Sequence, residues 1–97
     1  MIKYALLATL KAKSGKESEV AEFLKSALPL VEAEPDTKTW YAIKFNDSTF
    51  GIFDTFEDEA GRDAHLNGKV AAALMAKADE LFSESPDIKK LDVLAEK

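Results

Sequence analysis

The residue best suited to chemistry in this sequence is His65, the only histidine among 97 residues. It lies near the end of a short predicted helix, behind the acidic run Glu57–Glu59. A neutral imidazole accepts protons near neutral pH, so His65 could remove a proton from an acidic phenol. The alternative is structural, because the partial negative charge at a helix C-terminus favours a cationic imidazole.

The second candidate is Asp54, which shares its strand alternation with three apolar residues: Phe50, Ile52 and Phe56. A carboxylate on an apolar sheet face has a raised pKa unless it is paired. Such a group suits a general base or a hydrogen bond to a substrate. The alternatives for Asp54 are an ion pair with Lys or Arg across a subunit interface and exposure at a sheet edge.

Five aromatic residues could complete a site for an aromatic ligand: Trp40, Tyr41, Phe50, Phe53 and Tyr4. The first four would line a flat apolar slot, and the tyrosine near the N-terminus would offer its phenol. The alternative for all five is a purely structural place in the core. The carboxylates of Glu57–Glu59 are expected to compensate a helix dipole rather than bind a metal, so we expect neither a metal nor another cofactor.

Composition limits the other possibilities. A chain of 97 residues is expected to form one domain, residues 1–97, and its 46% hydrophobic content indicates a globular fold. The net charge of −5, without a Lys/Arg cluster, argues against nucleic-acid binding. No apolar run approaches the ~20 residues needed to span a membrane. The absence of cysteine and of a signal-peptide pattern fits a cytoplasmic protein.

The first half of the chain predicts a strand and a helix. Apolar residues alternate over residues 4–12, and both faces of this strand are largely apolar. Ser14 and Glu17 have the spacing of a capping box at a helix start. Pro29 should end or kink the helix near Leu28. The helical stripe comprises Val20, Phe23, Leu24, Ala27, Leu28 and Val31.

The second half predicts a hairpin, two helices and a final strand. The strands Trp40–Phe45 and Thr49–Phe56 flank a polar turn, Asp58 caps a short helix to Leu66, and a longer helix covers Lys69–Phe82. A strand over residues 88–95 closes the chain. The order βαββαβ predicts an α+β, ferredoxin-like fold with a four-stranded antiparallel sheet and helices on one face.

The uncovered face of this sheet is not expected to be polar. Several large apolar side chains lie on each face of the predicted strands. The apolar area left uncovered by the helices would therefore exceed the few hundred Å² that is usual for a monomer. Covering about 600 Å² of apolar surface is worth on the order of 15 kcal/mol before association costs. We therefore expect a homodimer joined sheet to sheet. The alternative is a deep monomer core.

The segment EPDTKTWYAIKFNDSTFGIFDTFEDEAGRDAHL resembles the antibiotic biosynthesis monooxygenase (ABM) family. The similar features are the Glu-Pro-x-Thr loop, an aromatic-started strand, a strand running into an acidic helix start, and an Ala-His-Leu that carries His65. The resemblance implies a dimeric α/β barrel with an apolar pocket between sheet and helices. Some members oxygenate polycyclic aromatic substrates with O₂ and no metal or flavin, whereas others degrade haem or process small signalling molecules.

The haem-degrading branch resembles this chain least. That branch pairs a Trp at the end of the third strand with a helix histidine and an Asn on the first strand. Here the strand ends in Phe56, and the first strand offers Leu6 and Leu7 without an Asn. Trp40 also begins a different strand from the usual catalytic Trp, so only His65 carries over from the family pattern.

Three functions follow as hypotheses. The first is a cofactor-independent monooxygenase acting on a small aromatic or quinol-type substrate, with His65 or Asp54 as the base. The second is a non-catalytic, small-ligand-binding or stress-related dimer with the same pocket. The third is a small-molecule isomerase that uses the same base without O₂.

Overall fold

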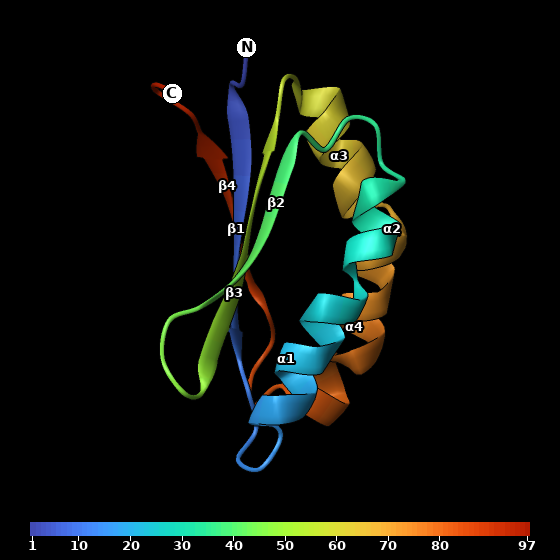
Figure 1. Ribbon diagram of the computed structural model, residues 1–97, viewed down its shortest axis with the longest axis vertical. Helices are drawn as coiled ribbons and strands as arrows, with labels where there is room; N and C mark the ends of the chain where they lie inside the picture. The colour runs from blue at the N-terminus through green and yellow to red at the C-terminus, as the bar shows by residue number, and fades with distance from the viewer.

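Four strands form one antiparallel sheet, and all the helices lie on one side of it (Figure 1). The computed structural model describes residues 1–97. The elements in chain order are β1 (Tyr4–Lys11), α1 (Glu17–Ser26), α2 (Leu28–Glu32), β2 (Thr39–Lys44), β3 (Thr49–Phe56), α3 (Glu59–Leu66), α4 (Lys69–Leu81) and β4 (Asp87–Asp92). The strand order β2-β3-β1-β4 confirms the predicted ferredoxin-like fold. No helix is both long and apolar enough to cross a membrane.

The start of α1 differs from the predicted capping box. Lys16 is the N-cap residue, and no side chain caps the helix. The carboxylate of Glu17 instead accepts a hydrogen bond from the backbone N–H of Gly15 at 2.9 Å. Gly15 has φ = 87°, a left-handed conformation that glycine adopts without steric cost. This turn moves Ser14 out of capping position, so the capping-box prediction was wrong.

The break at Pro29 is confirmed. Helix α1 ends at Ser26, and α2 starts at Leu28 with the proline in its first turn. A proline is tolerated there because the first helical N–H groups have no partner within the helix. The chain can therefore continue along the sheet as two short helices.

The hairpin and the start of α3 also follow the prediction. Strand β3 has the predicted bounds, whereas β2 starts and ends one residue earlier. The Asp58 side chain caps α3 by accepting a hydrogen bond from the N–H of Gly61 at 2.7 Å. The final strand, β4, is shorter than the segment 88–95 that the sequence predicts.

The strand register places the core on the helix side of the sheet. Along β1, Leu6, Ala8 and Leu10 lie opposite Asp54, Ile52 and Phe50 of β3. Of these apolar residues, all but Leu6 join buried side chains of α1 and α4 in one core cluster. Its helical members are Val20, Leu24, Leu74 and Leu81. Asp54 is therefore a carboxylate on the most buried face of the sheet.

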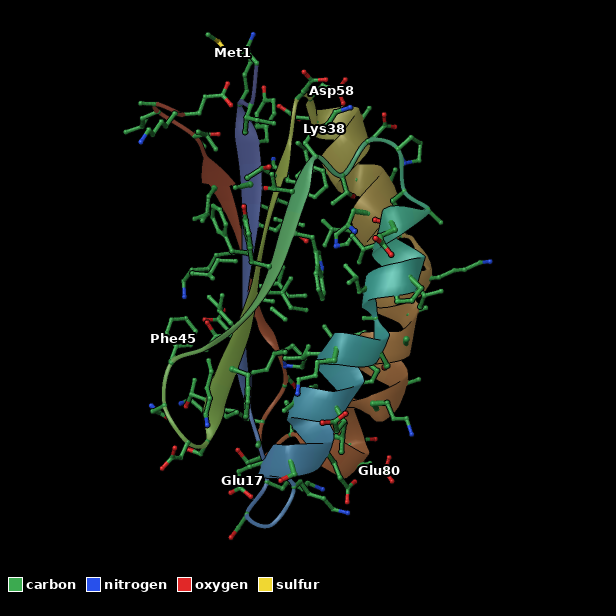
Figure 2. The ribbon with its side chains drawn as sticks, in the orientation of Figure 1. Met1, Glu17, Lys38, Phe45, Asp58 and Glu80 are labelled. Atoms are coloured by element: carbon green, nitrogen blue, oxygen red, sulfur yellow. The ribbon has the colours of Figure 1, made fainter.

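The opposite face of the sheet carries exposed apolar side chains along β2 and at the residue that follows it, Phe45. Tyr41, Ile43 and Phe45 are 56%, 36% and 53% exposed. Phe45 points away from the helices (Figure 2), and its ring packs over Gly51, where an added Cβ would lie 2.9 Å from the ring. This apolar outer face of β2 agrees with the prediction that the second face is not polar. The other edge strand, β4, is polar, because its Asp87 and Lys89 side chains form an ion pair with each other at 2.7 Å.

Candidate active site

The side chain of His65 turns inward between two carboxylates. It lies in the last turn of α3 and is only 7% exposed. Its Nε2 lies 2.8 Å from Oδ2 of Asp54, and its Nδ1 lies 2.5 Å from Oε1 of Glu34. Both ring nitrogens are therefore occupied, and the imidazole joins a strand of the sheet to the loop that precedes β2.

Two glycines allow this loop to approach α3 closely. A Cβ on Gly61 would lie 3.1 Å from Cβ of Asp36, and a Cβ on Gly68 would lie 3.0 Å from Oε2 of Glu34. A Cβ at either position would make a tight contact, so the neighbouring group would have to shift by a few tenths of an ångström. The small residues therefore help to hold Glu34 against His65.

Asp54 presents one bonded and one unbonded oxygen. The residue is 1% exposed, and its Oδ1 has no hydrogen-bond partner among the protein atoms. Burial raises the pKa of this carboxyl, and the hydrogen bond from His65 offsets only part of that effect. A buried carboxylate with raised proton affinity and a free oxygen has the properties of a general base.

His65 has the opposite balance of effects. Burial by itself lowers the pKa of the imidazole, but the hydrogen bonds to Asp54 and Glu34 outweigh burial and raise the pKa above its usual value. An imidazolium is stabilised when each of its N–H groups donates to a carboxylate. The two carboxyl groups beside the ring therefore favour its protonated form.

Asp54 and His65 face a common small cavity between the sheet and the helices. Its volume is about 30 Å³, and its walls are mostly apolar. A space of this size holds about one water molecule, whereas an aromatic ring needs on the order of 150 Å³. The lining comprises Leu6, Ala8, Ile52, Asp54, His65, Leu66, Val70, Ala71, Leu74 and Ile88. The family resemblance implies an apolar pocket at this place, and the cavity found there is smaller than one ring.

The five aromatic candidates do not form one slot. Tyr41 and Phe53 pair across the strands on the outer face of the sheet, away from His65. Phe50 is buried in the core, and Tyr4 lies under the guanidinium of Arg62, with 5.0 Å between that group and the ring centroid. None of the five lines the cavity beside Asp54.

Trp40 is the aromatic candidate that lies directly opposite Asp54 in the sheet. The two residues are opposite each other in the β2–β3 register and share the helix side of the sheet. The indole packs against the core clusters, and its Nε1–H is buried without an acceptor. The indole N–H of Trp40 and Oδ1 of Asp54 are therefore a buried donor and a buried acceptor that both lack a partner among the protein atoms.

Sequence reasoning missed Glu34, the third residue of the site, and also the burial of Arg62 on the helix that carries His65. Glu34 lies in a loop, where no periodicity reports burial, and its contact with His65 depends on how the loop folds back on α3. Arg62 is buried, and its Nη1 donates to the backbone carbonyl of Leu91 at 3.2 Å. The position of Arg62 on α3, three residues before His65, was the available signal, since residues three apart share a helix face.

No protein-family model and no curated protein matches the chain. Among solved structures, NE2512 from Nitrosomonas europaea, a protein of unknown function, is 58% identical over 100% of this chain and 94% of its own, with a TM-score of 0.98. Rv0793 from Mycobacterium tuberculosis is 16% identical, covering 97% of each chain, with a TM-score of 0.84.

An antibiotic biosynthesis monooxygenase is 13% identical over 95% of this chain and 99% of its own, with a TM-score of 0.81. A sequence identity of 13% shows only a shared fold, whereas the 58% identity to NE2512 shows membership of one protein family. The chain therefore belongs to the same protein family as NE2512 and has the fold of the antibiotic biosynthesis monooxygenases.

Proposed function

We propose that this protein is a cofactor-independent monooxygenase acting on a small aromatic or quinol-type substrate. The observation that carries the proposal is the free Oδ1 of Asp54, a buried carboxylate oxygen beside an apolar cavity. The fold shared with an antibiotic biosynthesis monooxygenase supports the same reaction class.

In this proposal, Asp54 rather than His65 accepts the substrate proton. Both nitrogens of His65 already contact carboxylates, so the ring has no free lone pair for a substrate. His65 holds Asp54 in place and stabilises its charge. Loss of the proton leaves an electron-rich substrate anion, which reduces O₂ directly. The substrate carbon loses two hydrogens and four electrons, one oxygen atom enters the substrate, and the other leaves with two protons as water.

Trp40 does not line the cavity, so its indole N–H would take part only after the cavity has widened. In the widened site this buried donor, which lies in the row of Asp54, would donate to a developing oxyanion on the substrate. The apolar walls of the cavity would strengthen both interactions by excluding water.

Entry of a substrate requires the cavity to widen. The outer wall includes Ile88 of the edge strand β4, which is 41% exposed, and Leu66 at the end of α3. Because an edge strand has only one hydrogen-bonded neighbour, movement of β4 is the least costly way to admit a ring. The size of the cavity matches a molecule as small as O₂.

The assembly we propose is a homodimer joined through the outer face of the sheet. Tyr41, Ile43 and Phe45 would be covered by the second copy. Such a dimer would close a barrel-like space between the two sheets, as the family resemblance implies.

The second candidate is an isomerase or a non-catalytic ligand-binding dimer. The pairing of Asp54 with His65 supports it equally, whereas the cavity volume does not separate the candidates, because each of them needs room for a ligand. An isomerase would use Asp54 to move a proton and would need no oxygen.

The deciding experiment compares product formation from a panel of hydroxylated aromatics in air and under nitrogen. We expect oxygen uptake and products carrying one added oxygen atom only in air. Equal turnover without oxygen would indicate the isomerase, and ligand-induced stabilisation without turnover would indicate the binding protein.

A further inference from the structure

Glu34 connects the buried pair to a second cavity, which opens at the surface. This cleft has a volume of about 170 Å³ and lies between the loop before β2 and α3. It is lined by Ala33, Glu34, Pro35, Asp36, Thr37, Gly61, Ala64 and His65. His65 therefore borders two spaces, the buried cavity beside Asp54 and the surface cleft beside Glu34.

An unbroken series of hydrogen bonds runs between the two spaces. Oδ2 of Asp54 lies 2.8 Å from one ring nitrogen of His65, and Oε1 of Glu34 lies 2.5 Å from the other. The hydroxyl of Thr37 donates to the same glutamate oxygen at 2.8 Å. The exposed fraction of the side chains rises along the series, from 2% for Asp54 to 7% for His65 and 20% for Glu34.

We propose that Glu34 is the proton exit of the site, through which His65 exchanges protons between buried Asp54 and solvent in the cleft. The inference rests on the proposed role of Asp54 as the base. Glu34 would be a positioning and relay residue, because its carboxylate contacts His65 and not the cavity where the substrate reacts.

The relay conserves protons and charge. The relay starts from a site in which Asp54 and Glu34 carry no proton and His65 carries one on each nitrogen, so the net charge of the three is −1. Asp54 accepts the substrate proton at Oδ1, His65 passes the proton on Nδ1 to Glu34, and Glu34 releases that proton to water, which leaves Asp54 and His65 neutral and the net charge at −1. Asp54 then gives its proton to the oxygen atom that leaves as water, and Glu34 returns a proton from solvent to Nδ1 of His65, which restores the starting site.

The charged groups around His65 are few. Asp54 faces it from β3 and Glu34 from the loop, and these are the two groups that shift its pKa upward. Helix α4 contributes only apolar side chains to the adjoining cavity, and the guanidinium of Arg62 on α3 is directed to backbone carbonyls. Asp36 lines the outer cleft beyond Glu34.

His65 allows a direct test, because a single histidine gives one set of imidazole NMR signals. We would measure the exchange of its ring N–H protons with water in protein labelled with ¹⁵N-histidine, over a range of pH. Glu34→Gln should slow the exchange about tenfold or more, because an amide does not accept and release a proton near neutral pH. Glu32→Gln, in an exposed position of α2, is the matched control and should leave the rate unchanged.

Exchange that is unchanged or faster in Glu34→Gln than in Glu32→Gln would overturn the proposal. Should Glu34→Gln not fold, Thr37→Val tests the same point, because it keeps the carboxylate and removes its hydroxyl donor. The pH profile of exchange should then move to higher pH, because the variant lacks a hydrogen bond that stabilises the charged form of the Glu34 carboxylate in the wild type. An unmoved profile would contradict the relay. Neither readout needs a substrate, so the relay and the oxygenase proposal can fail separately.

Discussion

At the residue level, the two oxygens of Asp54 have different surroundings. Oδ2 contacts His65 at 2.8 Å, whereas Oδ1 is buried without a partner. A buried acceptor is costly when it stays unsatisfied, and the adjoining cavity has room for one water molecule or for a substrate group that would satisfy Oδ1. His65 holds the carboxylate in this position, and its own charge depends on Asp54 and Glu34 together.

The raised pKa of His65 predicts how stability depends on pH. The folded protein binds the imidazole proton more tightly than the unfolded chain does. The resulting stabilisation is fully present below about pH 6.5 and is lost as pH rises through the raised pKa. The raised pKa of Asp54 acts in the same direction, because the folded state also binds that proton more readily.

Urea unfolding of the wild type and of His65→Gln at a series of pH values checks this expectation. The free energy of unfolding of the wild type should fall as pH rises above about 6.5, and the variant should lack this decline. At pH 6 the free energy of unfolding of the variant should be lower by about 3 kcal/mol, because Asp54 and Glu34 lose the charged partner that they share. A wild type whose stability rises over this range, or a variant with the same decline, would contradict the assignment.

At the level of elements, the start of α3 sets the direction of the helix that carries His65. Asp58 caps it with a 2.7 Å hydrogen bond to the N–H of Gly61. Asp58→Ala should therefore lower the free energy of unfolding by about 1 kcal/mol, the usual value of an N-cap. Thermal or urea unfolding measures the change.

Ser14→Ala is the matched control for the cap, because Ser14 has the sequence spacing of a cap but makes no capping contact with α1. It should change the free energy of unfolding by less than about 0.5 kcal/mol. Equal losses in the two variants would contradict the description of both helix starts.

The elements could be predicted because each carries its own local signal. Alternation identified β1 and β3, the polar turn identified the hairpin, and Asp58 and Pro29 marked helix boundaries. The capping box at Ser14 failed because Gly15 takes a left-handed turn that redirects Glu17. The contact of Glu34 with His65 joins residues far apart in sequence, so no local pattern reports it.

The alternation of residues along β3 correctly placed Asp54 on the same face as its apolar neighbours. Alternation does not predict which side chain of a helix packed on that face will contact Asp54. His65 was therefore predicted as a separate candidate, and the structure shows that it pairs with Asp54. Alternation could have argued against the aromatic slot, because the neighbouring residues Trp40 and Tyr41 must lie on opposite faces of one strand, as the register shows.

At the level of the whole molecule, the helices cover one face of the sheet and leave the apolar outer face of β2 exposed (Figure 1). Tyr41→Glu should convert the proposed homodimer to a monomer, because a charge in an apolar interface is desolvated without a partner. Sedimentation at micromolar concentration measures the mass. Met75→Glu, on the outer side of α4 and equally exposed at 56%, is the control and should remain dimeric.

A wild type that sediments as a monomer would contradict the proposed assembly, as would dissociation of both variants to the same extent. A monomeric wild type would also remove the proposed barrel-like space between two sheets. The pairing of Asp54 with His65 would be unaffected, since both residues belong to one chain.

The central claim, that Asp54 is the base of an oxygenase, is tested most directly by the rate of oxygen uptake in Asp54→Asn. A substrate found in the aromatic panel would be used, and Asp92→Asn, an exposed aspartate of β4, would serve as the control. We predict that Asp54→Asn loses about 100-fold or more in rate, the effect of removing a general base, while the control keeps the wild-type rate. Oxygen uptake by Asp54→Asn at the wild-type rate would contradict the account.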